Sequence, residues 1–213
     1  MADGNKPTKN SMTYVIGVFT ALQVSAIAKG ALFFYCGYHY CGEYIPVPAS
    51  TDLVTKLNFT IRCIVLALLP MMIFNAMVRV KRLEFGAEDP LRGRDHLLQL
   101  EKNVLGNTME QFAVFCICAV VLATFLDTPE QMKVVPLYTA AFIIGRVLFR
   151  IGYGFQSSTV YRGLGMNINF GSNYCVLAYI LYQMCNKGFM FGLETLNMSA
   201  RDAGDAIKGH VEL

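Results

Sequence analysis

An apolar segment in the middle of the chain carries polar side chains that could bind a ligand or pair with a cation. The stretch VLGNTMEQFAVFCICAVVLATF, from Val104 to Phe125, contains Asn107, Glu110 and Gln111. On a helix of 3.6 residues per turn, their spacing places these three side chains on one face. A carboxylate at the depth of a lipid bilayer is costly unless it is paired or functional. Glu110 therefore predicts a buried partner or a binding site.

A second polar stripe lies in the next apolar segment. Arg146, Arg150 and Tyr153 follow one another at steps of four and three residues, so they also share one helical face. If the two stripes face each other, or a neighbouring protomer, Glu110 is neutralised by Arg146 or Arg150. Such a structural pair would set how the helices pack without doing any chemistry.

The alternative is that some arginines stay unpaired and their positive charge binds a ligand. Arg162 follows the second stripe and Arg79 ends an earlier apolar segment, so both arginines would add to the charge at one side of the membrane. A cluster of guanidinium groups can hold an anion or stabilise a thiolate. The residues alone leave both interpretations open.

The composition of the chain favours a membrane protein. Of the 213 residues, 54% are hydrophobic and 15% are charged, and the mean hydropathy is +0.42. The net charge is only +3 and the basic residues form no run interleaved with aromatic residues, which argues against nucleic acid as a partner. The three histidines are not clustered and no CxxC pair occurs, so no metal site is predicted. Motifs of hydrolases and nucleotide-binding enzymes are also missing from the sequence.

Five apolar segments predict an all-α bundle of five transmembrane helices. Each segment is long enough, or nearly so, to cross a hydrocarbon core of about 30 Å, so the lipid bilayer is a predicted partner. The segments cover residues 13–35, 59–77, 104–125, 135–155 and 168–191. The predicted divisions are a cytosolic tail at 1–12, an extra N-terminal transmembrane helix at 13–36, a four-helix transmembrane domain at 59–191 and a polar tail at 192–213.

The first apolar segment is similar to a signal peptide as well as to a signal anchor. Lys6 and Lys9 precede it, and the AIA triplet at residues 26–28 resembles a cleavage site. The apolar run resumes directly after Lys29, which favours an uncleaved helix.

The distribution of basic residues orients the bundle. Nine lysines and arginines lie in the N-terminus and in the second and fourth connections, against five on the opposite side. This excess predicts a cytosolic N-terminus and a luminal or extracellular C-terminus. Asn197 begins a sequon on the luminal side and is a candidate for glycosylation. Cys36 and Cys41 would face the same oxidising side, either joined in a disulfide or as two interfacial thiols. No sorting motif distinguishes the ER, Golgi, lysosome and plasma membrane.

Four motifs in the predicted four-helix domain resemble the MAPEG superfamily, the membrane-associated proteins of eicosanoid and glutathione metabolism. In order, they are VRVKRLEFGAEDPLRG after the second segment, NxxE at Asn107–Glu110, GRVLFRIGY at 145–153, and Arg162. Within the superfamily the closer resemblance is to mattrin-like proteins, which also place an extra helix before a MAPEG-like domain and have a segment similar to TMEQF. The resemblance implies a four-helix MAPEG bundle with one additional N-terminal helix, assembled as a homotrimer.

The resemblance also implies a ligand site. In the glutathione-using members, the tripeptide lies between protomers near the cytosolic face. The matching positions in this chain are Arg79, Asn107, Glu110, Tyr153 and Arg162. Arg162 matches the arginine that lowers the pKa of the glutathione thiol, a role that suits a cation beside a thiolate.

Three positions depart from the pattern of the enzymes. Asn103 stands where they carry an arginine, Gly106 stands where they often carry a basic residue, and Phe149 stands where they carry histidine or tyrosine. Loss of an arginine that grips a carboxylate with two hydrogen bonds would weaken glutathione binding. Lys102 lies about 100° around the helix from Asn103 and is not expected to replace that arginine.

Two functions follow from the resemblance. The first is a non-catalytic multi-pass protein of the secretory and endolysosomal membranes that acts on trafficking or on other membrane proteins, since mattrin-like proteins are associated with vesicle trafficking and epithelial barrier formation. The second is a glutathione-dependent transferase or peroxidase acting on lipophilic substrates that enter from the bilayer. Only the second function would use glutathione as a cofactor, with Arg162 as the catalytic residue that stabilises the thiolate.

Overall fold

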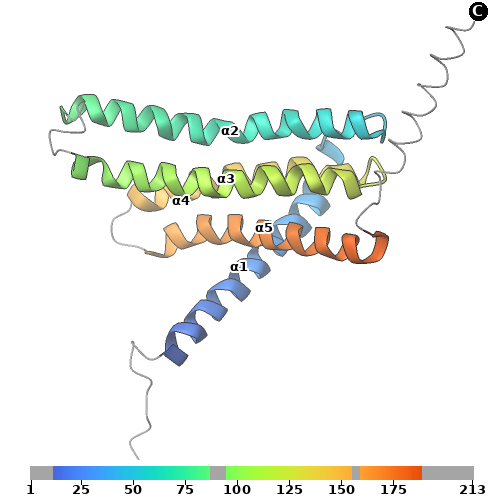
Figure 1. The fold of residues 1–213 in the computed structure, drawn as a ribbon, viewed down its shortest axis with the longest axis horizontal. Helices are drawn as coiled ribbons and strands as arrows, with labels where there is room; N and C mark the ends of the chain where they lie inside the picture. The colour runs from blue at the N-terminus through green and yellow to red at the C-terminus, as the bar shows by residue number, and fades with distance from the viewer. Residues whose placement is uncertain (1–11, 87–94, 155–158, 189–213) are drawn as a thin grey trace, which may run out of the picture.

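The described part of the chain contains helices and no β-strand. The computed structural model describes residues 12–86, 95–154 and 159–188. Its long helices are α1 (Met12–Cys41), α2 (Leu53–Glu84), α3 (Gln99–Phe125), α4 (Val134–Gly154) and α5 (Thr159–Lys187), as Figure 1 shows. The predicted all-α class is confirmed. Apart from Met12, the predicted terminal tails, including the sequon at Asn197, lie outside the described residues.

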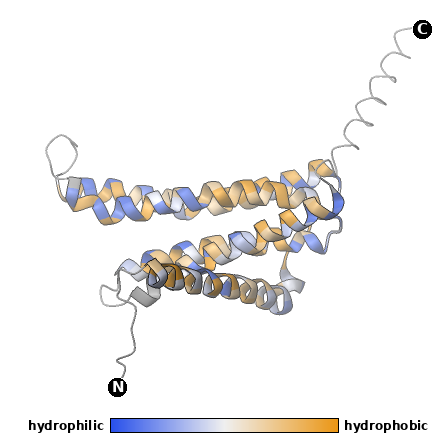
Figure 2. Cartoon of the chain, turned by 60° about the horizontal axis from the view of Figure 1, so that its bottom comes forward, coloured by the Kyte–Doolittle hydropathy of each residue, from blue (hydrophilic) through white to orange (hydrophobic). Residues whose placement is uncertain are grey.

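Four of these helices are long and apolar enough to cross a membrane. They are α1, α2, α3 and α4, together with the short turns that adjoin some of them. In Figure 2, long apolar stretches are flanked by hydrophilic residues toward the ends of the bundle. Large apolar side chains such as Ile61, Leu69 and Ile117 are more than half exposed on the outside of the bundle. Lipid chains can cover this surface, so the structure agrees with a membrane-embedded bundle.

Helix α5 is long enough to cross a membrane but more polar than the other four. Its 29 residues would span about 43 Å at 1.5 Å per residue. Asn169, Ser172 and Asn173 lower its hydropathy, and all three side chains are buried within the bundle. The fold therefore buries the polar face of α5 away from lipid. That α5 crosses the membrane as a fifth transmembrane helix stays a prediction.

Helix α1 crosses α5 at a contact between two glycines. A Cβ atom added to Gly30 would lie 2.3 Å from the backbone carbon of Gly171, and one added to Gly171 would lie 1.8 Å from the carbonyl oxygen of Ala26. Figure 1 shows α1 running obliquely across the other helices at this level. Because only glycine lets the two backbones approach this closely, Gly30 and Gly171 fix where α1 docks.

The connections at one end of the bundle are held by capping contacts. Asp52 caps α2 by accepting a hydrogen bond from the backbone N–H of Thr55 at 3.0 Å. Hydrogen bonds from the side chains of Ser50 and Thr55 hold the pKa of Asp52 at about 2, so the cap is ionised at neutral pH. Lys56 is buried and donates to the carbonyl oxygen of Leu126 at 2.9 Å, which ties the start of α2 to the end of α3.

The alternative of a disulfide between Cys36 and Cys41 is not realised. Both residues belong to α1 and both thiols are free. Five residues on one α-helix turn the chain by about 140°, so the two side chains point to different sides of α1. The interpretation of two free thiols is the one that the structure supports.

The glycine contact gives a first testable prediction. Gly30→Leu should overpack the crossing of α1 and α5 and lower the free energy of unfolding in detergent by about 1–3 kcal/mol. Gly17→Leu is the matched control, because a Cβ atom at Gly17 meets nothing within 4 Å. Equal loss of thermal stability in both variants would contradict the assigned contact.

Candidate functional site

The two polar stripes predicted on the third and fourth segments face each other across α3 and α4. At their centre, the side chain of Arg146 is completely buried. Its Nη1 donates to Oδ1 of Asn107 on α3 at 2.8 Å. When the amide of Asn169 on α5 is turned so that its oxygen faces Arg146, this oxygen accepts a hydrogen bond from Nη2 of Arg146 at 2.7 Å. Arg146 therefore joins α3, α4 and α5 through hydrogen bonds to neutral amides.

The surroundings of Arg146 are built for a planar cation. Its guanidinium carbon lies 4.9 Å from the centre of the Phe149 ring and 6.0 Å from that of Phe142, within the range of cation–π attraction. Gly145 leaves the space that Asn169 fills, because a Cβ atom there would lie 2.7 Å from the amide carbon of Asn169. The dipeptide Gly145-Arg146 thus supplies both the cation and the room for its partner.

Other polar contacts join α3 to α4 and to α5. Nη2 of Arg150 lies 3.0 Å from Oε1 of Glu101, whose side chain is nearly buried. On α5, Asn173 donates a hydrogen bond to Oε1 of Gln111 on α3 at 3.1 Å. It also accepts one from the hydroxyl of Tyr138 on α4 at 2.6 Å. Burial in a membrane bundle makes unpaired polar groups costly, so these contacts fix the rotation of each helix about its axis.

The expected pairing of Glu110 with Arg146 or Arg150 is wrong within the chain. Arg146 bonds Asn107 and Arg150 bonds Glu101, while Glu110 is exposed. Helices α3 and α4 run antiparallel, so the position on α4 level with Glu110 lies about one turn beyond Arg146, near Phe142. The stripes face each other as expected, but in this helix register the carboxylate that pairs with Arg150 is that of Glu101.

Glu110 instead lines a polar cleft of about 550 Å³. The described lining comes from α3, α4 and α5 and comprises Lys102, Asn103, Gly106, Asn107, Glu110, Phe149, Tyr153 and Met166. Three of the residues predicted from the family resemblance, Asn107, Glu110 and Tyr153, are therefore brought together. The ring of Tyr153 lies edge-on to that of Phe149, with 5.1 Å between their centres.

The other residues of the predicted ligand set are not part of this described lining. Arg79 is exposed near the end of α2. Arg162 lies in the first turn of α5, and its side chain lies outside the described residues. The cleft that one chain forms thus contains part of the set.

Lys102, which was not expected to replace the arginine missing at Asn103, also lines the cleft. Its angle of about 100° from Asn103 on the helix suggested a different face. The cleft is wide enough to include both residues. The spacing in the sequence could have indicated this. Lys102 and Gly106 are four residues apart and share one helical face, which adjoins the face of Asn103 and Asn107.

The Arg146 contacts predict a measurable coupling. Arg146→Leu should lower the free energy of unfolding in detergent by about 2–3 kcal/mol, because it leaves the buried amides of Asn107 and Asn169 without their donor. The double variant with Asn107→Leu should recover about 1 kcal/mol or more of that loss. Glu110→Gln is the control and should change stability little. Coupling of Arg146 to Glu110 rather than to Asn107 would refute this assignment.

Comparison with known proteins gives the family of the chain. The model of the MAPEG family matches residues 60–182, which is more than half of the chain. Transmembrane protein 79 of Mus musculus is 23% identical over 163 residues, covering 76% of this chain and 41% of the relative. The Bos taurus protein of the same name is 22% identical, covering 76% of this chain and 40% of the relative.

This chain therefore spans about two fifths of the length of these relatives. No solved structure matches it. The resemblance to mattrin-like proteins, a name for the transmembrane protein 79 group, is confirmed, and the family match includes the residues at Asn107–Glu110 and Gly145–Tyr153. The chain is a member of the MAPEG family.

Proposed function

We propose that this protein is a non-catalytic multi-pass membrane protein that uses the MAPEG bundle as a scaffold for contacts with other membrane proteins. We place it in the secretory and endolysosomal membranes, with its N-terminus in the cytosol. The polar cleft lies at the end of the bundle where α3 begins and α4 ends, which is the cytosolic side in this orientation.

The observation that carries this proposal is the low positive charge of the cleft. Among the described lining residues, Lys102 is the one permanent cation and Glu110 adds a negative charge. The two arginines of α4 point instead to Asn107 and Glu101 inside the bundle. Glutathione carries two carboxylates and a net negative charge, so it would meet little electrostatic attraction in this part of the cleft.

Asn107 supports the same conclusion. Its amide oxygen accepts from Nη1 of Arg146, so the residue serves the packing of α3 on α4. Asn103 and Gly106 line the cleft in the positions where the glutathione-using enzymes carry basic side chains. Neither can supply the charge-assisted hydrogen bonds that an arginine makes to a carboxylate.

The alternative function is a glutathione-dependent transferase or peroxidase for lipophilic substrates. The convergence of Asn107, Glu110 and Tyr153 on one cleft favours it. In a homotrimer, the exposed Arg79 could complete the cleft of a neighbouring protomer, and Arg162 would stabilise the thiolate. In that case the enzyme would need these two arginines to offset the missing basic residues on α3.

Titration with glutathione separates the two functions. If the dissociation constant exceeds 10 mM, then 10 mM glutathione adds less than about 0.4 kcal/mol to the stability, and the melting temperature in detergent hardly moves. We expect this result, together with no conjugation of glutathione to an electrophile such as 1-chloro-2,4-dinitrobenzene. A clear thermal shift and a conjugating activity that Arg162→Ala abolishes would favour the enzyme.

A gain-of-function variant sharpens the test. Asn103→Arg places a guanidinium in the cleft and should produce a glutathione-dependent thermal shift where the parent chain shows none. Lys81→Arg, on α2 and outside the described lining of the cleft, is the matched control and should show no shift. A shift of equal size in the parent chain would mean that the cleft already binds the tripeptide.

A further inference from the structure

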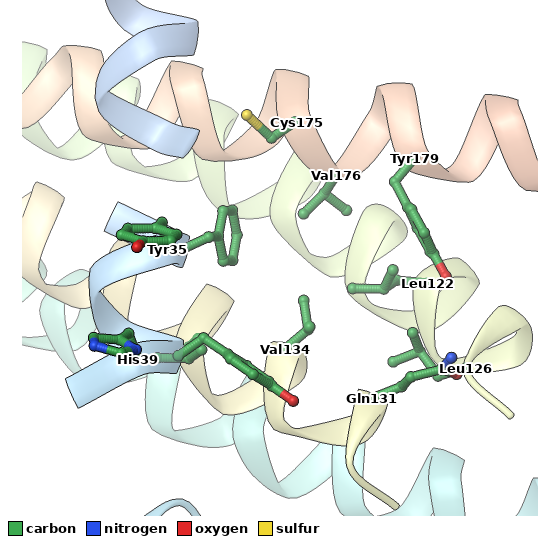
Figure 3. A pocket seen from close by; sticks show the side chains of 12 residues that line it. Tyr35, His39, Leu122, Leu126, Gln131, Val134, Cys175, Val176 and Tyr179 are labelled. Carbon is green, nitrogen blue, oxygen red and sulfur yellow. The ribbon is translucent and has the colours of Figure 1, made fainter. Parts of the chain in front are cut away.

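A second cavity lies at the opposite end of the bundle from the polar cleft. Its volume is about 540 Å³, within the range of small-molecule binding sites. Figure 3 shows side chains of four helices surrounding it, among them Tyr35 of α1, Leu122 of α3, Val134 of α4 and Tyr179 of α5. The polar cleft is lined by the start of α3 and the end of α4, whereas this cavity is lined by the end of α3 and the start of α4.

Helix α1 makes a large part of this cavity. It supplies Phe34, Tyr35, Tyr38 and His39, and so forms an aromatic wall that the four-helix domain alone would lack. The wall is held in place by the Gly30 contact with α5 and by Gly37, where a Cβ atom would lie 2.6 Å from Cδ2 of Leu137. A ligand in the cavity would therefore contact α1 and the MAPEG domain together.

The described lining contains no aspartate, glutamate, lysine or arginine. At the same end of the bundle, Lys133 pairs with Glu130 at 2.5 Å and Lys187 pairs with Asp127. A carboxylate or phosphate group entering the cavity would lose water without gaining the permanent positive charge of a lysine or arginine. The lining thus selects against fatty acids and against the headgroups of phospholipids.

Neutral hydrogen-bonding groups are present at the cavity instead. The hydroxyl of Tyr179 accepts from Nε2 of Gln183 at 2.6 Å, which leaves its own hydrogen for donation. Gln131 uses its carbonyl oxygen to accept from the backbone N–H of Asp127 at 2.8 Å, so its amide hydrogens can serve a ligand oxygen. The ring of His39 stacks on that of Tyr35 at 6.0 Å between centres.

We propose that this cavity binds a neutral lipid alcohol of the sterol class. Its apolar, ring-lined wall suits a rigid hydrocarbon body, which loses less conformational freedom on binding than a flexible acyl chain. A single hydroxyl group can be satisfied by Tyr179 or Gln131, whereas an ionised headgroup cannot. This inference is independent of the proposed function, because no residue of the polar cleft takes part in it.

Photolabelling of the full chain tests the proposal. The chain is reconstituted in phosphatidylcholine vesicles with a diazirine analogue of cholesterol, irradiated, and digested for mass spectrometry. We expect labelled peptides from the cavity walls on α1 and α5, and we expect unlabelled cholesterol to compete. A diazirine fatty acid, used as the charged probe, should label these peptides about tenfold less, because the described lining has no lysine or arginine to pair with its carboxylate.

A matched pair of variants on α4 makes the test specific. Val134→Phe fills the cavity and should reduce sterol labelling of its walls about tenfold. Val147→Phe makes the same change on the same helix at an exposed position outside the cavity, and labelling should stay unchanged. If Val134→Phe unfolds, Tyr38→Ala on the exposed side of α1 removes part of the aromatic wall instead and should also reduce labelling.

Two results would overturn the proposal. One is sterol labelling that unlabelled cholesterol does not compete or that the cavity variants leave unchanged. The other is equal labelling of the cavity by the fatty acid probe, which would mean that the cavity holds bulk lipid chains without selecting a neutral alcohol.

Discussion

The buried guanidinium of Arg146 is the constraint on which the rest of the bundle depends. A cation inside a membrane bundle must be solvated by protein groups, and here the groups are the amides of Asn107 and Asn169 and the faces of two phenylalanine rings. Each amide comes from a different helix, so the position of Arg146 sets the rotation of α3 and α5 around α4. The ion pair of Arg150 with Glu101 and the contact of Asn173 with Gln111 keep the same alignment at two other levels.

This arrangement also explains why the polar cleft is weakly charged. The arginines of α4, which could have faced a ligand, satisfy partners inside the bundle, and Asn107 shares in that task. Glu110 and Lys102 remain on the cleft side of α3, where their charges offset each other. The internal polar contacts therefore use the positive charge of α4, and Lys102 and Glu110 are the charged residues in the described lining of the cleft.

The two cavities differ in chemistry because they lie at different ends of the same helices. The polar cleft is formed by the amide-rich start of α3, whereas the second cavity is formed by its apolar end and by the aromatic end of α1. Helix α1 lies outside the segment that matches the family, yet its glycine contact with α5 places four aromatic or imidazole rings over that segment. The additional helix thus creates a surface that the four-helix domain does not have by itself.

The sequence by itself determined the membrane class, the helices and the two polar stripes, because hydrophobic length and helical periodicity are local properties. It also placed Asn107, Glu110 and Tyr153 in one site through the motifs of the family. Only the tertiary structure decided which polar side chains meet. In the antiparallel register of α3 and α4, Arg150 pairs with Glu101 and Arg146 donates to Asn107. Glu110 lines the cleft instead. Register depends on the packing of whole helices, including the close approach at Gly30 and Gly145, and the spacing of residues along one helix does not contain that information.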